Sequence, residues 1–299
     1  MKSIRKAGVA WRLVALAAVL ALVAVACGDD SGGGGGGGGD EDLLAQLQEA
    51  GTIQIGIANE IPYGYEDEDT GEVTGEAPEV AKLVLNDLGI ENVEANVVEF
   101  GALIGGLQAG NFDMIAAGMY ITPERAEQII FSDPDYCVLE SLLVEEGNPF
   151  GLTDLNSIAE TDAKVAVASG VVEADYVVWA GIPEDQIVEF AGIEDQYDAI
   201  AAGRVDAVTG TILTVQQHAD AMDGFEALPA FAPLDEDGNE VLGCGGFGFL
   251  DQDFRDAFND KLHEFQDSGQ VQDIVEEFLG LRSLAEEAEG LTVQDIIGN

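Results

Sequence analysis

Cations are scarce in this sequence of 299 residues. Eleven Lys and Arg stand against 58 Asp and Glu, so the formal net charge is −47 at pH 7. Such a charge repels nucleic acid and anionic membrane surfaces, and we exclude both as partners. Because 47% of the residues are hydrophobic, an acidic disordered chain is excluded as well. We interpret the charge as adaptation to high salt, where screening acts over a few ångströms; an acidic exported protein in ordinary medium is the alternative.

Histidine and cysteine are also few, and this limits metal chemistry. The two histidines, His218 and His263, are isolated in the sequence, and no Cys/His spacing is typical of a metal site. The stretch DEDGN (235–239) lacks the later Glu of a calcium loop and is predicted to be a polar turn. We therefore expect neither a metal nor a cofactor.

One hydrophobic run, LVALAAVLALVAVA (13–26), follows a basic start. It is too short for a membrane-spanning helix, which needs ~20 apolar residues, but it suits a signal peptide over 1–26. The ending AVAC resembles a bacterial lipoprotein cleavage box, with Cys27 as the lipidated residue, although Ala24 replaces the usual Leu. The Gly-rich acidic stretch 27–42 then forms a tether. We predict a protein on the outer face of the cytoplasmic membrane, held there only by its lipid; a soluble exported protein is the alternative.

The remaining chain alternates strand and helix patterns, which predicts parallel sheets covered by helices. Strands are expected at 51–58, 93–100, 112–118, 164–169, 186–190, 205–210 and 245–250; helices are expected at 79–89, 102–110, 123–130, 173–181, 194–203, 213–221, 254–269 and 271–280. We predict an α/β fold of two lobes. Lobe 1 spans 43–140 and 242–282, lobe 2 spans 141–241, and 283–299 is an acidic C-terminal tail.

The loops that follow the predicted strands are the candidate functional region. They are 58–65, 99–101, 118–125, 168–174 and 209–211. Ligands of open α/β sheets bind beyond the carboxyl ends of the strands. A single cleft where these five loops meet is therefore expected.

Three segments resemble a known family. FGALIGGLQAGNFDMIAAGMYITPERAEQIIFSDP (100–134), GRVDAVTG (203–210) and the stretch 246–269 are similar to the polar-amino-acid type of solute-binding proteins that serve ABC importers. The resemblance implies a periplasmic-binding-protein-like fold of type II, with two crossover strands between the lobes and a ligand cleft between them. It also implies a monomer without enzymatic activity, and a permease and an ATPase as partners.

The resemblance also assigns roles to residues. Arg125 matches the arginine that clamps the ligand carboxylate, a task suited to a planar guanidinium. Ser169, Gly170 and Val171 match the loop whose amides hold the other carboxylate oxygen. Amino-acid binders have an aspartate at the position of Thr211, where it neutralises the ligand ammonium. Because a threonine cannot balance a buried ammonium, a free α-amino acid is a poor candidate.

Aromatic residues offer another way to bind a cation. Glu60, Tyr63, Phe100 and Tyr120, together with Arg125, resemble the site of the ectoine and hydroxyectoine binders, a subgroup of this family; Tyr65 competes with Tyr63 for its role. Ectoine is a cyclic amidinium with a carboxylate, so the expected ligand is a small zwitterion. A polar amino acid or a betaine is the alternative ligand. An enzyme similar to cyclohexadienyl dehydratase, with Glu173 as its acid or base, is the alternative function.

Cys137 and Cys244 lie near the two predicted crossings between the lobes, at 138–147 and 241–248. An exported protein permits disulfides. Because the crossings are expected to run side by side, we hypothesise a disulfide between these cysteines.

Overall fold

The computed structural model describes residues 42–67 and 69–298. The predicted signal peptide, Cys27 and the predicted tether up to residue 41 lie outside the described residues. Within the described ranges, no helix is both long and apolar enough to cross a bilayer. Asp42 is described, and its side chain accepts a hydrogen bond from Ala45 N–H at the start of the helix α1 (Leu43–Ala50).

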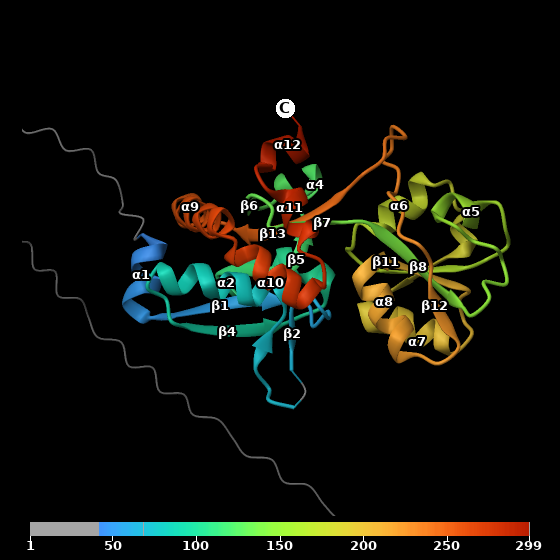
Figure 1. Cartoon of the computed structure of the whole chain (residues 1–299), viewed down its shortest axis with the longest axis horizontal. Helices are drawn as coiled ribbons and strands as arrows, with labels where there is room; N and C mark the ends of the chain where they lie inside the picture. Colours follow the sequence, from blue (N-terminus) through green and yellow to red (C-terminus); the bar gives the residue numbers. More distant parts are fainter. Residues whose placement is uncertain (1–41, 68, 299) are drawn as a thin grey trace, which may run out of the picture. The chain divides into compact units, whose positions relative to one another are not determined.

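The first sheet forms lobe 1 (Figure 1). Its strands run in the order β4 (Asn92–Val97), β1 (Thr52–Ile57), β5 (Met114–Tyr120), β13 (Gly243–Phe249) and β6 (Ile130–Phe131), and β7 (Tyr136–Val138) also pairs with β13. The strand β1 is parallel to β4 and β5, whereas β13 is antiparallel to its neighbours. A small hairpin, β2 (Tyr65–Glu66) with β3 (Val73–Thr74), stands apart from this sheet.

Alternating side chains of β5 fill both faces of this sheet. Met114 and Ala116 pack in the cluster that contains residues of α2 (Glu76–Asp87), α9 (Gln252–Ser268) and α10 (Gln270–Leu279). Their neighbours Ile115 and Ala117 pack in a second cluster with residues of α3 (Leu103–Gln108), which follows the short 3₁₀ helix η1 (Phe100–Ala102). The strand is therefore buried on both sides, as expected for a parallel sheet between helices.

Lobe 2 repeats this arrangement around a second sheet. Its strands run in the order β10 (Ile187–Phe190), β9 (Val165–Ala168), β11 (Ala207–Thr211), β8 (Glu140–Glu145) and β12 (Phe225–Ala227). Its helices are α5 (Leu155–Ala159), α6 (Glu173–Trp179), α7 (Ile193–Ala201) and α8 (Ile212–Ala221), with the 3₁₀ helix η2 (Glu184–Gln186). Val165 and Val167 belong to the cluster with α5 and α6, while Ala166 and Ala168 belong to the cluster with α7 and α8.

The lobes are joined where β7 leads into β8 and where the chain returns into β13. At this junction β7 and β13 pair antiparallel, with Cys137 opposite Cys244. The two cysteines form a disulfide that closes a sequence separation of 107 residues. The bond ties the late part of lobe 1 to the strand that leads out of it.

The predicted helix at 123–130 is shorter in the structure. The helix α4 (Pro123–Ala126) begins after Thr122, whose side chain accepts from Arg125 N–H, and it ends four residues early. Residues 130 and 131 form β6 instead and pair with Phe249 and Gly248 of β13. Tertiary pairing with a distant strand here overrides a local helix pattern.

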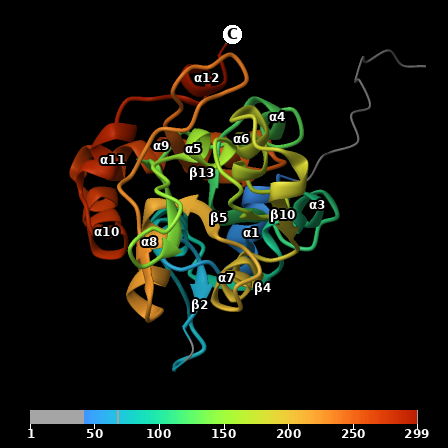
Figure 2. The ribbon, with the colours of Figure 1, turned by 90° about the vertical axis from the view of Figure 1, so that its right-hand side faces the viewer.

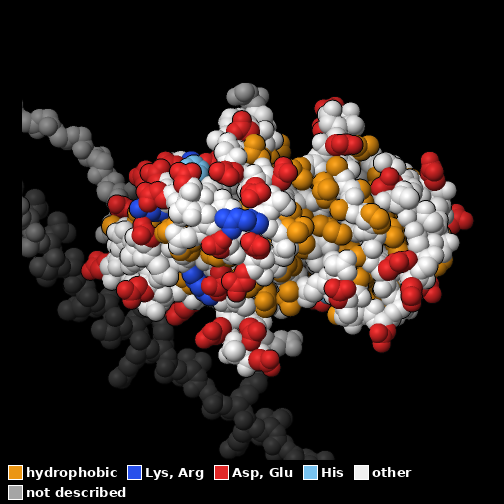
Figure 3. Space-filling model, in the orientation of Figure 1, with side chains coloured by type: hydrophobic (Ala, Val, Ile, Leu, Met, Phe, Trp, Pro, Cys, Tyr) orange, Lys and Arg blue, Asp and Glu red, His pale blue; other side chains and the backbone are white. Residues whose placement is uncertain are grey.

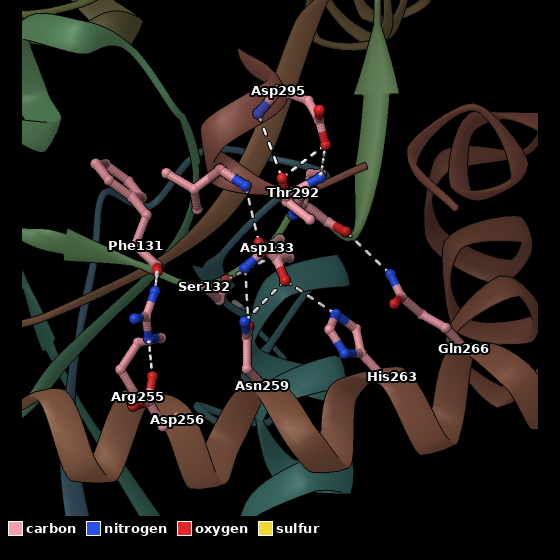
Figure 4. A network of polar contacts seen from close by, with 12 residues as sticks. Phe131, Ser132, Asp133, Arg255, Asp256, Asn259, His263, Gln266, Thr292 and Asp295 are labelled. Atoms are coloured by element: carbon pink, nitrogen blue, oxygen red, sulfur yellow. Dashed lines mark hydrogen bonds and ion pairs between the residues drawn. The ribbon is translucent and has the colours of Figure 1, made fainter. Parts of the chain in front are cut away.

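The expected acidic tail is a folded part of lobe 1 as far as residue 298. It contains α11 (Ser283–Ala288) and α12 (Val293–Ile297), and Figure 2 shows α11 beside α10. Ala288 packs against the disulfide. Asp133 anchors the start of α12 by accepting from Val293 N–H at 2.8 Å, and it also contacts Asn259 and His263 of α9 (Figure 4). Composition alone suggested a tail, because two short helices carry little hydrophobic periodicity.

Candidate functional site

The predicted loops meet around one cavity between the lobes. Residues from all five predicted loops line it. Seven of the nine predicted ligand residues line it: Glu60, Tyr63, Phe100, Tyr120, Arg125, Val171 and Thr211. Gly118, Val172 and Glu173 also line it, and the sequence interpretation did not include them among the ligand residues. Glu173 lies within the predicted 168–174 loop, so its place in the sequence could have indicated a position at the cavity.

Arg125 is buried with only 7% of its surface exposed. Its Nη1 donates to the carbonyl oxygen of Tyr120 at 2.8 Å, and its Nη2 donates to that of Gly170 in lobe 2 at 3.0 Å. The guanidinium also lies over the Phe100 ring, 5.3 Å from its centre. Burial lowers the pKa of Arg125, whereas the nearby Glu173 raises it. Since a guanidinium has five N–H donors, it can hold a carboxylate in addition to these two carbonyls.

Two of the three aromatic residues are fixed by their hydroxyl groups. Tyr63 stacks on Tyr136 with ring centres 5.3 Å apart, and its hydroxyl donates to Thr211 Oγ1 at 2.9 Å. Tyr120 donates to Glu140 Oε1 at 3.1 Å. These hydrogen bonds fix the orientation of both rings in the closed cleft, which lowers the entropy cost of forming an aromatic wall.

Thr211 takes part in a chain of hydrogen bonds that crosses the cleft. Tyr63 donates to Thr211, the Thr211 hydroxyl donates to Thr214 Oγ1 at 3.2 Å, and Thr214 donates to Glu60 Oε1 at 2.8 Å. Thr211 is also the N-cap of α8. The Thr211 hydroxyl is thus hydrogen-bonded to protein groups and links Tyr63 to Glu60 through Thr214.

Glu60 is a buried acid within this cavity. The residue as a whole is half-buried, but its carboxyl group is enclosed. Burial raises the pKa of Glu60 to about 8, with Glu173 and Glu194 raising it further and the hydrogen bond from Thr214 opposing them. A cation placed next to this carboxyl would favour its ionised form.

Ser169 and Gly170 do not line the cavity, but they bring the lobes into contact. The Ser169 N–H donates to Phe190 O at 2.8 Å and is therefore engaged within lobe 2. A Cβ atom built on Gly101 would lie 2.9 Å from Ser169 O, and one built on Gly170 would lie 2.5 Å from Gly101 Cα. The backbones of the two lobes thus touch directly beside Arg125, and the cleft is closed.

Metal-ligating side chains do not gather elsewhere in the described part of the chain. No group of three or more His, Cys, Asp or Glu in residues 42–67 and 69–298 is arranged to hold a metal ion. Figure 3 shows Asp and Glu spread over the visible face, with few Lys and Arg among them. The cavity therefore remains the candidate site.

Comparison with known proteins agrees with this architecture. Residues 53–281 match the bacterial extracellular solute-binding proteins, family 3. A probable amino-acid ABC transporter periplasmic-binding protein of Sinorhizobium fredii is 37% identical over 236 residues, 78% of each chain. The glutamine-binding protein GlnH of Bacillus subtilis is 27% identical over 66% of this chain and 71% of its own.

Solved structures give the same picture. The crystal structure of EhuB in complex with hydroxyectoine superposes with a TM-score of 0.77 at 32% identity, covering 85% of this chain and 97% of that one. The ancestral amino-acid-binding protein AncCDT-1 shares the fold at 23% identity, with a TM-score of 0.69 over 79% of this chain and 99% of its own. The fold is thus the two-lobed type II periplasmic-binding-protein fold. This chain belongs to family 3 of the bacterial extracellular solute-binding proteins, whose members bind small ligands and work with the permease and ATPase of ABC transporters.

Proposed function

We propose that this protein captures ectoine or hydroxyectoine, small zwitterionic compatible solutes, for an ABC importer. The carrying observation is the composition of one closed cavity. Arg125 provides N–H donors for a carboxylate, and Tyr63, Phe100 and Tyr120 provide ring faces for a delocalised cation. Thr211 supplies no charge for a primary ammonium, which disfavours free amino acids. The likeness to the EhuB complex with hydroxyectoine supports the same ligand class.

Calorimetric titration of the purified protein in high-salt buffer tests this proposal. Ectoine should bind tightly, and glutamine should give little or no signal. Glutamine binding without ectoine binding would contradict the proposal. It would mean that the cavity neutralises an ammonium without an aspartate at position 211.

Glycine betaine distinguishes the compatible solutes from one another. Betaine has no N–H donor, so it cannot donate to Glu60, whereas the amidinium of ectoine can. Glu60→Gln should therefore weaken ectoine binding and spare any betaine binding. Equal losses for both ligands would argue that Glu60 acts only through its packing.

An enzyme on the same scaffold is the second candidate, because Glu173 places a buried carboxyl in the cavity. We propose binding without turnover. The relatives described above are named as binding proteins of transporters. Recovery of chemically unchanged ectoine after prolonged incubation would support this view, and a new product would refute it.

We also propose that a lipid on Cys27 holds the protein, as a monomer, at the outer face of the membrane, near its permease. Metabolic labelling with a fatty acid should mark the wild type but not Cys27→Ser.

The acidic surface is proposed to suit high salt, since screening reduces self-repulsion. Unfolding midpoints that do not rise with salt would contradict that interpretation.

A further inference from the structure

Glu140 lies directly behind the cavity wall, although it does not line the cavity. It opens β8, where its backbone pairs with Thr211 of β11, and only 1% of it is exposed. Its Oε1 accepts the hydrogen bond from Tyr120. Its Oε2 is buried, and no N–H or O–H donor from the described residues reaches it. A buried carboxylate oxygen that accepts no hydrogen bond destabilises the folded protein, so the groups next to it must be identified.

The carboxyl of Glu173 lies next to that of Glu140. Glu173 is the first residue of α6, lines the cavity and is 7% exposed. The two side chains are within hydrogen-bonding reach of each other. Two buried carboxylates in contact cannot both ionise without a large penalty, whereas a shared proton turns the repulsion into a hydrogen bond.

The surroundings favour placing this proton on Glu140. Burial raises the pKa of Glu140 and the charge of Glu173 raises it further, whereas the hydrogen bond from Tyr120 opposes them. Burial also raises the pKa of Glu173, but a hydrogen bond from Glu140 and the positive charge of Arg125 lower it. The groups that face the pair are Tyr120 from β5, Arg125 from α4, Tyr176 from α6, Tyr197 from α7, and Glu60 and Tyr63 from the segment after β1. Among these groups the positive charge is that of Arg125, on the side of Glu173.

We infer that Glu140 is a protonated positioning residue, which donates its proton to Glu173 and accepts the hydroxyl of Tyr120. Glu173 then faces the cavity as one negative charge, and the Tyr120 ring is held in a fixed orientation beside it. This inference rests on the proposed function, because it supplies the anionic group for the ligand cation that Thr211 does not provide. Glu140 thus keeps Glu173 ionised and holds the Tyr120 ring in its orientation, without contacting the ligand itself.

Infrared spectroscopy of the protein without ligand tests the proton directly. Because Glu60 is also protonated at neutral pH, replacing Glu140 by Gln should remove one component of the absorption in the protonated-carboxyl region and leave the rest. The matched control is Glu145→Gln, at the exposed end of the same strand, which should leave that region unchanged. If Glu140→Gln removes only ionised-carboxylate absorption, Glu140 is charged and the inference is wrong.

Ectoine titration tests the positioning role. Glu140→Leu removes the acceptor for Tyr120 and the donor for Glu173, so affinity should fall about tenfold or more. Glu140→Gln keeps both an acceptor oxygen and an N–H donor, so it should restore most of that affinity. A Gln variant as weak as the Leu variant would overturn the inference, because a neutral hydrogen-bonding group would then not suffice. If the Leu variant does not fold, the infrared comparison with the Gln variant decides.

The two measurements separate this inference from the proposed function. Failure of the wild type to bind ectoine would refute the proposed ligand, while the infrared result would still locate the proton. Conversely, tight ectoine binding together with an ionised Glu140 would refute only the inference.

Discussion

Replacing Gly101 by Ala should impair closure of the cleft without unfolding either lobe. The new Cβ would lie 2.9 Å from the carbonyl oxygen of Ser169 and 3.3 Å from its carbonyl carbon. Both atoms belong to backbone, so no side chain can rotate away to make room. The backbone of Gly101 has no positive φ that would strain an alanine. The effect should therefore arise from the contact between the lobes, unlike a change at Gly170, where φ is +79°.

The expected magnitude follows from the hydrogen bond beside this contact. Restoring an ordinary separation of ~3.5 Å requires the lobes to move apart by roughly half an ångström. The bond from Arg125 Nη2 to Gly170 O, now 3.0 Å, would then stretch beyond an effective length. A hydrogen bond of a charged group contributes about 1.5–3 kcal/mol, so affinity should fall roughly ten- to a hundredfold.

Calorimetric titration with ectoine measures the affinity of the variant, and thermal unfolding measures its stability. Gly105→Ala is the matched control, because its Cβ would have no neighbour within 4 Å and alanine suits the helix α3. The control should bind like the wild type, and both variants should keep their unfolding temperature. Wild-type affinity in Gly101→Ala would refute the view that this backbone contact limits closure.

Three further predictions address ligand choice, the disulfide and pH. Thr211→Asp should keep the cap of α8 and place a carboxylate where amino-acid binders carry an aspartate. Titration should then show new amino-acid binding and weaker ectoine binding; unchanged selectivity would contradict the role of this position. Replacing Cys137 and Cys244 by Ala should lower the free energy of unfolding by about 2–5 kcal/mol, because the disulfide closes a long loop. Denaturant titration measures this change. A loss well below that range would argue that the disulfide hardly restrains the unfolded chain. The pKa of Glu60 is raised from 4.5 to about 8, so the native state binds more protons than the unfolded state in this window and stability falls as pH rises from about 5 to about 8. Glu60→Gln should flatten that part of the pH profile of unfolding, and an unchanged slope would show that this carboxyl is already ionised in the folded protein.

Tyr120 illustrates how packing changes the design of such tests. Its expected contact with the ligand makes a change to Ala the obvious test of binding. In the structure Tyr120 is 5% exposed and belongs to the hydrophobic core of lobe 1. A Cβ on Gly243 would lie 2.1 Å from its ring, so the ring packs tightly against β13. An alanine there should cost about 3–5 kcal/mol of stability, which makes Glu140 variants the cleaner probe.

The sequence by itself determined the alternation of strands and helices and the loops that form the cavity. Hydrophobic periodicity is local, so β1, β9 and the helices α2 and α9 could be placed from it to within a few residues. The convergence of the loops followed from a general rule of parallel sheets. The role expected of Arg125 came from the resemblance to the solute-binding family, and the structure places Arg125 on α4 at the cavity.

Only the tertiary structure decided how these groups are paired. The strand β6 forms because residues 130 and 131 meet β13, more than a hundred residues away, and no local pattern carries that contact. The placement of Glu140 behind Tyr120 and next to Glu173 joins β8, β5 and α6. A sequence with 58 acidic residues does not reveal which few of them lose water, because burial is a property of the closed fold. Burial removes water from the carboxyl groups of the site and raises their pKa, and this distinguishes them from the carboxyl groups of the surface.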